Sequence, residues 1–212
     1  MSGFFTWLYG ADVFLRGEAS IESFFGVAYW TLFLFIPALT MRMIAEERNS
    51  GTIELLLTKP VTDWQVIVGK FVACIALVGI ALLFSLPYYF TVAWLGPVDH
   101  GAVWCGYIGI LLLSSAYAGI GIFASSIAQN QIVAFLLSLC TGIFFVIIFN
   151  MFAGGMSGWA GRIFHYLSFS PHYESFTRGV IDSKDVIYFA SFTLLTLLLA
   201  HGVLSRRNAI DA

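Results

Sequence analysis

The chain has 212 residues, of which 59% are hydrophobic and only 10% are charged, whereas average soluble domains have roughly 25% charged residues. With a mean hydropathy of +0.89, this composition excludes an ordinary soluble domain and predicts an all-α, polytopic helical membrane protein. The net charge of −2 and the 10 lysines and arginines exclude the basic surface that nucleic-acid binding requires. Three cysteines without CxxC spacing predict neither a disulfide framework nor a metal site.

The first apolar run of the chain is short. It lies within residues 1–10, well below the roughly 20 residues that a transmembrane helix needs. No basic residue precedes it as in a signal peptide. On the residues alone, one interpretation is a short surface tail, followed by an outer loop over 11–22.

Five longer apolar segments are expected to cross the membrane and to form one transmembrane domain over 1–212. In the second, Pro87 is expected to loosen the far end of the helix. In the third, Ser115 and Gly119 form a small-xxx-small pair that lets another helix approach closely, and neighbouring glycines extend that surface. A polar turn, SSIAQNQ, follows it. The expected spans are 23–43, 66–89, 102–124, 132–152 and 186–204.

Residues 44–65, between the first two spans, are the most polar interval of the chain and predict a loop on one membrane face. The charged residues from Arg42 to Arg48 indicate that the first helix extends out of the membrane. Gly51 predicts the turn that ends it, because glycine tolerates left-handed backbone. Thr62 and Gln65 have the spacing of a capping box, which predicts the beginning of the next helix.

A second short helix is expected at the tip of this loop, over residues 52–57. Ile53, Leu56 and Leu57 fall at positions i, i+3 and i+4, which share one face of a helix. Pro60 ends the helix, because proline cannot continue it. The loop is therefore predicted to be a helical hairpin with a small amphipathic crosspiece.

Residues 154–185 are too polar to span a membrane and too apolar to be a free linker. Ser170 and Pro171 predict the cap and first position of a helix that Gly179 ends. Glu174 and Arg178 are i, i+4 partners on this helix, and the pair is expected at least to stabilise it. The pattern predicts a short amphipathic helix that lies on the membrane or dips into it.

The distribution of basic residues predicts the orientation of the spans. Six basic residues fall on the side of the polar loop and four on the opposite side, and the excess places this loop and the C-terminus in the cytoplasm. The first group is Arg42, Arg48, Lys59, Lys70, Arg206 and Arg207, and the second is Arg16, Arg162, Arg178 and Lys184.

The run FLFIPALTMRMIAEERNSGTIELLLTKPVTDWQVIVGK resembles the permease subunits of type-2 ABC exporters, above all the gliding-motility and nitrous-oxide-reductase-maturation group. The resemblance rests on three motifs in order, EER, GT-E-LL and a proline. A weaker similarity continues in SPHYESFTRGVID. It implies that the crosspiece is a coupling helix that docks on a separate ATPase subunit and passes its closure to the membrane helices. The residues that it assigns to coupling are Glu46, Glu47, Arg48, Gly51, Thr52, Ile53, Glu54, Leu55, Leu56, Leu57 and Pro60.

The same resemblance implies a dimer of permease chains, identical or different, with two ABC ATPase subunits that bind ATP and magnesium. No cofactor is then expected in this chain. In the gliding and maturation group, an extracytoplasmic accessory protein is a further expected partner. The resemblance places the chain in the bacterial inner membrane, with re-entrant helices at the outer face over 154–185. It also makes residues 1–10 the remnant of a sixth transmembrane helix, the second interpretation of that run.

No pattern in the sequence predicts a catalytic or metal site. Lys70 lacks the earlier glycine of a Walker loop, the four histidines form no i, i+4 pair, and no GxSxG elbow occurs. His201 is the closest exception to spans with almost no ionisable residue. Two alternatives stay open beside a permease. One is an ATPase-coupled scaffold or mechanical transducer acting on an extracytoplasmic partner, and the other is an intramembrane enzyme that uses His201.

Overall fold

A computed structural model describes residues 22–50, 62–96, 98–156 and 158–211. Helices and turns make up these residues, and no strand occurs among them. The elements are α3 (Glu22–Thr40), α4 (Ala45–Asn49), α6 (Asp63–Leu83), α7 (Leu86–Leu95), α8 (His100–Ile127), α9 (Gln131–Ile143), the π-helical turn η2 (Phe144–Ile148), α10 (Phe149–Gly155), α11 (Trp159–Leu167), α12 (Phe169–Thr177) and α13 (Ser183–Asp211).

Five helical runs in the described residues are long and apolar enough to cross a membrane. They overlap the five expected spans, and the prediction of an all-α, polytopic membrane protein is confirmed. Residues 1–10 and the crosspiece over 52–57 lie outside the described residues. The five runs are Phe24–Glu47, Asp63–Trp94, His100–Ile127, Gln131–Gly155 and Ser183–Arg206.

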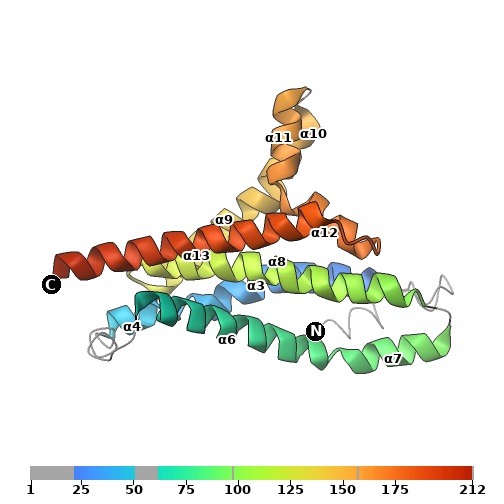
Figure 1. Cartoon of the computed structure of the whole chain (residues 1–212), viewed down its shortest axis with the longest axis horizontal. Coiled ribbons are helices and arrows are strands. Elements are labelled where there is room, and N and C mark those ends of the chain that lie inside the picture. The colour runs from blue at the N-terminus through green and yellow to red at the C-terminus, as the bar shows by residue number, and fades with distance from the viewer. Residues whose placement is uncertain (1–21, 51–61, 97, 157, 212) are drawn as a thin grey trace.

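The central helix of the bundle is α8, which lies between α6 and α13 (Figure 1). In the most apolar stretch of α8, 72% of the residues are buried inside the protein. In the corresponding stretches of the other four candidate spans, at most 44% are buried. Helix α8 packs on α3, α6, α9, α12 and α13. The positions of these neighbouring helices therefore depend on the shape of the α8 surface.

Glycines on α8 let these neighbours approach closely, as the sequence predicts. A Cβ atom at Gly119 would lie 2.2 Å from Thr196 Oγ1 of α13, and one at Gly121 would lie 1.9 Å from Thr40 Oγ1 of α3. One turn from Gly119, the Ser115 hydroxyl lies 3.1 Å from Thr193 Oγ1. Small residues at helix interfaces have this effect in membranes, since packing replaces the hydrophobic effect as the main attraction. Gly106 and Gly109 likewise leave room for the side chains of Phe25 and Phe176.

The second expected span is two helices instead of one. Helix α6 ends at Leu83, and α7 begins at Leu86 with Pro87 in its first turn. The Ser85 hydroxyl occupies the break, donating to the Leu82 carbonyl at 2.6 Å and lying 2.9 Å from Tyr107 Oη of α8. The loosening predicted from Pro87 is confirmed, because proline supplies no N–H to continue the ladder.

Replacing Gly121 by alanine should destabilise the bundle by about 1–3 kcal/mol, since the new methyl group overlaps the Thr40 side chain. Gly79→Ala is the matched control, because nothing lies within 4 Å of a Cβ there. Thermal unfolding of the detergent-purified protein should show a lower midpoint for Gly121→Ala alone. Equal midpoints for the two variants would contradict the packing described.

Candidate functional site

The candidate site is the base of the polar loop, where α3 leads into α4 and α6 begins. Helix α3 ends at Thr40, residues 41–44 form a turn, and α4 occupies Ala45–Asn49. A turn therefore interrupts the helical run Phe24–Glu47, which carries Arg42, Glu46 and Glu47 beyond α3. The physical reason is a hydrogen-bonding partner from another helix.

That partner is the buried Ser125 of α8. Its hydroxyl oxygen accepts the backbone N–H groups of Ile44 at 3.1 Å and of Ala45 at 3.0 Å. The same hydroxyl donates to the Met41 carbonyl at 3.1 Å. One side chain thus satisfies three backbone groups of the turn that leads into α4.

A lysine ties the other side of the turn to α6. The Lys70 ammonium donates to the Met43 carbonyl and to the Glu47 carboxylate. Lys70 is 16% exposed and Glu47 is 32% exposed, so the ion pair is partly shielded from water and from salt. The turn is consequently held from two directions, by α8 and by α6.

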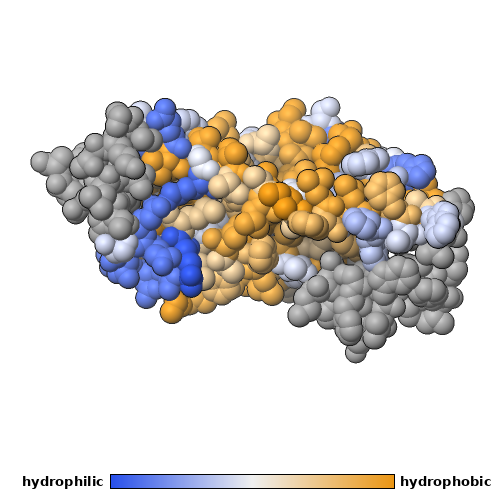
Figure 2. Space-filling view, turned by 90° about the horizontal axis from the view of Figure 1, so that it is seen from below, coloured by the Kyte–Doolittle hydropathy of each residue, from blue (hydrophilic) through white to orange (hydrophobic). Residues whose placement is uncertain are grey.

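The two neighbouring glutamates of α4 have different surroundings. Glu46 lies 3.9 Å from Arg42 in an exposed i, i+4 pair, which contributes little to stability. Glu47 contacts Lys70 instead. These four side chains, with Met43 and Ser50, line a polar pocket of about 380 Å³. Figure 2 shows hydrophilic residues gathered at the α4 end of the molecule, beside a largely hydrophobic surface.

The beginning of α6 matches the sequence prediction. The Thr62 N–H donates to Gln65 Oε1 at 3.0 Å, and the Gln65 N–H donates to Thr62 Oγ1 at 3.4 Å, which completes the capping box. The first turns of α6 pack on the end of α13, where the Trp64 and His201 rings are 5.7 Å apart. Ile67 is fully buried in the same cluster.

Most of the predicted coupling residues fall outside the described residues. These are Gly51, Thr52, Ile53, Glu54, Leu55, Leu56, Leu57 and Pro60. Arg48 is described only as part of α4, so the structure places the side chains of Glu46 and Glu47 alone. Sequence reasoning missed Ser125 and Lys70. The serine lies in SSIAQNQ, which the sequence predicts as a turn, but α8 continues to Ile127.

Residues 154–185 differ from their prediction in where the helix begins. Helix α12 begins at Phe169 with Ser168 as its cap residue, so Ser170 is not the cap and Pro171 is the third residue. One face of the helix, with Phe169, His172, Tyr173 and Phe176, is buried against α3, α8 and α13, and Glu174 is exposed on the opposite side, which is the pattern of an amphipathic helix. Its depth in a bilayer stays a prediction.

The end of α12 follows the prediction. Gly179 has a φ of +79°, the left-handed conformation that favours glycine after a helix. Arg178 Nε donates to the Glu174 carbonyl at 3.2 Å, so the Arg178 side chain contacts the backbone of Glu174. Helices α10 and α11 pack on each other and stand out from the bundle (Figure 1). Across the described ranges, no cluster of histidine, cysteine, aspartate or glutamate has the geometry to hold a metal ion.

Replacing Ser125 by alanine leaves the buried N–H groups of Ile44 and Ala45 without their acceptor. An unsatisfied buried donor costs about 1–3 kcal/mol, so the midpoint of thermal unfolding should fall. Ser126→Ala is the control, because the Ser126 hydroxyl donates only to the Phe123 carbonyl of its own helix. A Ser126 variant as unstable as the Ser125 variant would count against the assignment.

Comparison with known proteins identifies the family of the chain. A family model described as ABC-2 family transporter protein matches residues 13–205. The chain is 27% identical over 181 residues to the probable multidrug ABC transporter permease YbhR of Escherichia coli strain K12, and equally to that of Escherichia coli O157:H7. These alignments cover 79% of this chain and 46% of each relative, so the chain spans about half the length of the curated relatives it matches. Since the family match extends over almost the whole sequence, the chain belongs to the ABC-2 family of transporter proteins.

Proposed function

We propose that this chain is the membrane permease subunit of an ABC exporter and that the loop between α3 and α6 receives movement from a separate ATPase subunit. The ATPase would bind ATP and magnesium, and this chain would hold no cofactor. The crosspiece over 52–57 would dock on the ATPase through the apolar face of Ile53, Leu56 and Leu57. The loop and the C-terminus would face the cytoplasm from the bacterial inner membrane.

The observation that carries this proposal is the attachment of the loop base to two transmembrane helices. Ser125 connects the turn before α4 to α8, and Lys70 connects it to α6. A force on the loop would therefore reach the central helix of the bundle through short, buried contacts. Flexible attachment through solvent would lose such a displacement within the loop.

A second chain of the same fold would complete the translocation path. Helices α3 and α9 present an open apolar groove of about 820 Å³, in which Thr31 is the single hydroxyl-bearing residue. Trp30, Leu34 and Phe35 are exposed on it. Because α3 leads directly into the loop base, movement of the loop would change the width of this groove. An apolar cargo fits such walls, in keeping with the multidrug relatives.

A second proposal is that the chain belongs to the gliding and maturation group and acts as a mechanical transducer. The EER and GT-E-LL motifs support it. So does the α10–α11 hairpin, which presents exposed Met151, Phe152 and Trp159 away from the bundle. ATP hydrolysis that responds to an extracytoplasmic protein, with no response to apolar solutes, would favour the transducer over the exporter.

Replacing both Glu54 and Leu56 by lysine should remove the ATPase from the complex, because a buried apolar anchor is lost and charges are inserted. The expected weakening is about 2 kcal/mol or more. The measurement is the stoichiometry of the Walker-containing subunit that co-purifies in mild detergent, identified by mass spectrometry. Glu174→Lys, an exposed change on the outer segment, is the control. Unchanged association of the double variant would contradict docking through the crosspiece.

A cysteine at Leu34, in a background without the native cysteines, should cross-link two chains in membranes. Leu34 is 56% exposed on the α3–α9 groove. Leu195 of α13 is 54% exposed and serves as the control position, since it lies outside the groove. Equal cross-linking at both positions, or cross-linking at Leu195 alone, would place the dimer contact elsewhere.

A further inference from the structure

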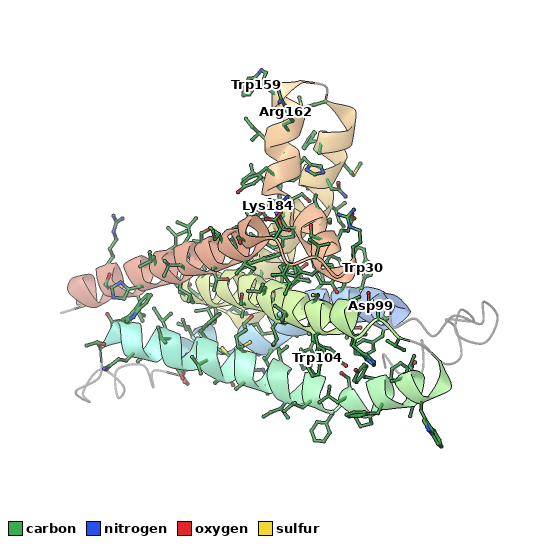
Figure 3. All side chains as sticks on the ribbon, turned by 45° about the vertical axis from the view of Figure 1, so that its right-hand side comes forward. Trp30, Asp99, Trp104, Trp159, Arg162 and Lys184 are labelled. Carbon is green, nitrogen blue, oxygen red and sulfur yellow. The ribbon has the colours of Figure 1, made fainter. Side chains whose placement is uncertain are left out.

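The outer segment contains a buried pair of ionisable side chains that the loop base does not involve. His172 of α12 is 5% exposed, and Asp185 in the first turn of α13 is 1% exposed. His172 Nδ1 lies 2.6 Å from Asp185 Oδ1, and His172 Nε2 lies 2.8 Å from the Tyr166 carbonyl oxygen. Figure 3 shows neighbouring Lys184 at the base of the α10–α11 hairpin, with Trp159 and Arg162 towards its tip.

The imidazole of His172 is held by three contacts. A carbonyl oxygen only accepts hydrogen bonds, so Nε2 donates to the Tyr166 carbonyl. One proton lies between Nδ1 and Asp185 Oδ1 and makes the second hydrogen bond. The Tyr188 ring stacks on the imidazole with centroids 4.0 Å apart and planes at 17°.

Burying this pair stabilises the contact between the two helices less than an apolar pair would. Removing two ionisable side chains from water costs more free energy than burying apolar side chains of the same volume. Asp185 Oδ2 is also buried without a hydrogen-bond partner in the described part of the chain. By contrast, Asp182 and Lys184 form an ion pair at 2.9 Å that is 41% and 61% exposed, and the Lys184 hydrogen bond holds the pKa of the Asp182 carboxyl below its usual value. An ionisable pair buried beside a transmembrane helix points to function before stability.

Helix α13 connects this pair to the loop base. Its outer end carries Asp185 and Tyr188, whose hydroxyl donates to the Leu167 carbonyl at 2.6 Å. Its other end packs on α6 through Leu197, Ala200 and Ile67. Hydroxyl groups make other polar contacts of α12, with Tyr173 Oη donating to the Phe25 carbonyl of α3 at 3.3 Å and Ser170 Oγ donating to the Val146 carbonyl of η2 at 3.3 Å. The contact of α12 with α13 joins two ionisable side chains.

We propose that His172 and Asp185 form an outer joint, the hydrogen-bonded connection through which α13 moves the α11–α12 segment during the ATP-driven cycle. The proposal rests on the function proposed above, because the ATPase supplies the movement. His172 and Asp185 act as positioning residues and touch no cargo. When the joint opens, both side chains and the unpartnered Asp185 oxygen reach water, so the incomplete hydrogen bonding of the closed joint favours its release.

The test replaces both ionisable side chains at once. His172→Phe with Asp185→Leu should stay folded, since an apolar pair replaces a hydrogen-bonded one without leaving either partner buried alone. Spin labels at the exposed positions Trp159 and Ile187, in a background without native cysteines, report the distance from the hairpin to α13. The double variant should lose the single narrow distance distribution of the parent protein. Asp182→Asn with Lys184→Gln removes the exposed pair and should leave the distribution unchanged.

The second measurement is ATP turnover by the complex reconstituted in liposomes. The double variant should retain the ATPase subunit but lose about fivefold or more of its turnover, the lower end of typical coupling between sites. A distance distribution equal to the parent's overturns the joint. A broadened distribution with full turnover overturns its role in the cycle. If no ATPase binds the parent protein, the proposed function fails, and the label distances still decide whether the joint exists.

Discussion

The structure depends most on the contact between Ser125 and the turn that follows α3. A helix that simply continued from α3 would satisfy its own N–H groups and would point the loop along the helix axis. Ser125 accepts the N–H groups of Ile44 and Ala45 instead, and this fixes a separate α4 against the end of α8. Ala45 is fully buried beside Ala128 and Ala134, so the turn is packed as well as hydrogen-bonded. The contacts of Lys70 with Met43 and Glu47 begin at the same turn.

Because the rest of the bundle packs around α8, a change at that contact affects the other helices. Helix α8 carries Ser125 near its C-terminal end and the glycines that admit α3 and α13 along its length. Displacement at Ser125 therefore acts on a helix whose neighbours are in close contact, where small shifts are not absorbed by loose side chains. Helix α13 then extends from the loop base to the contact between His172 and Asp185. The polar contacts at both ends of the bundle are linked by tightly packed apolar helices.

Sequence alone predicts the features that depend on neighbouring residues. The capping box of Thr62 and Gln65, the break at Pro87 and the left-handed Gly179 are local, and the structure has all three. The close approach at Gly119 also follows from composition. The missed contacts join distant residues: Ser125 and Ile44 are 81 positions apart, Lys70 and Glu47 are 23 apart, and His172 and Asp185 are 13 apart. The cap assigned to Ser170 failed because tertiary packing, with Phe169 fully buried, fixed where α12 begins.

The central claim is that the loop base transmits ATPase movement to the transmembrane helices. The most direct measurement is the distance between spin labels at Thr31 of the two chains in a dimer, before and after the ATPase is trapped with nucleotide. It is made in the parent protein and in Lys70→Met with Glu47→Gln, which frees α4 from α6 without leaving an unpaired charge. Trapping should change the distance in the parent protein and change it clearly less in the variant, where Ser125 alone still ties the turn to the bundle, while the variant still binds its ATPase. An equal change in both would contradict transmission through this contact.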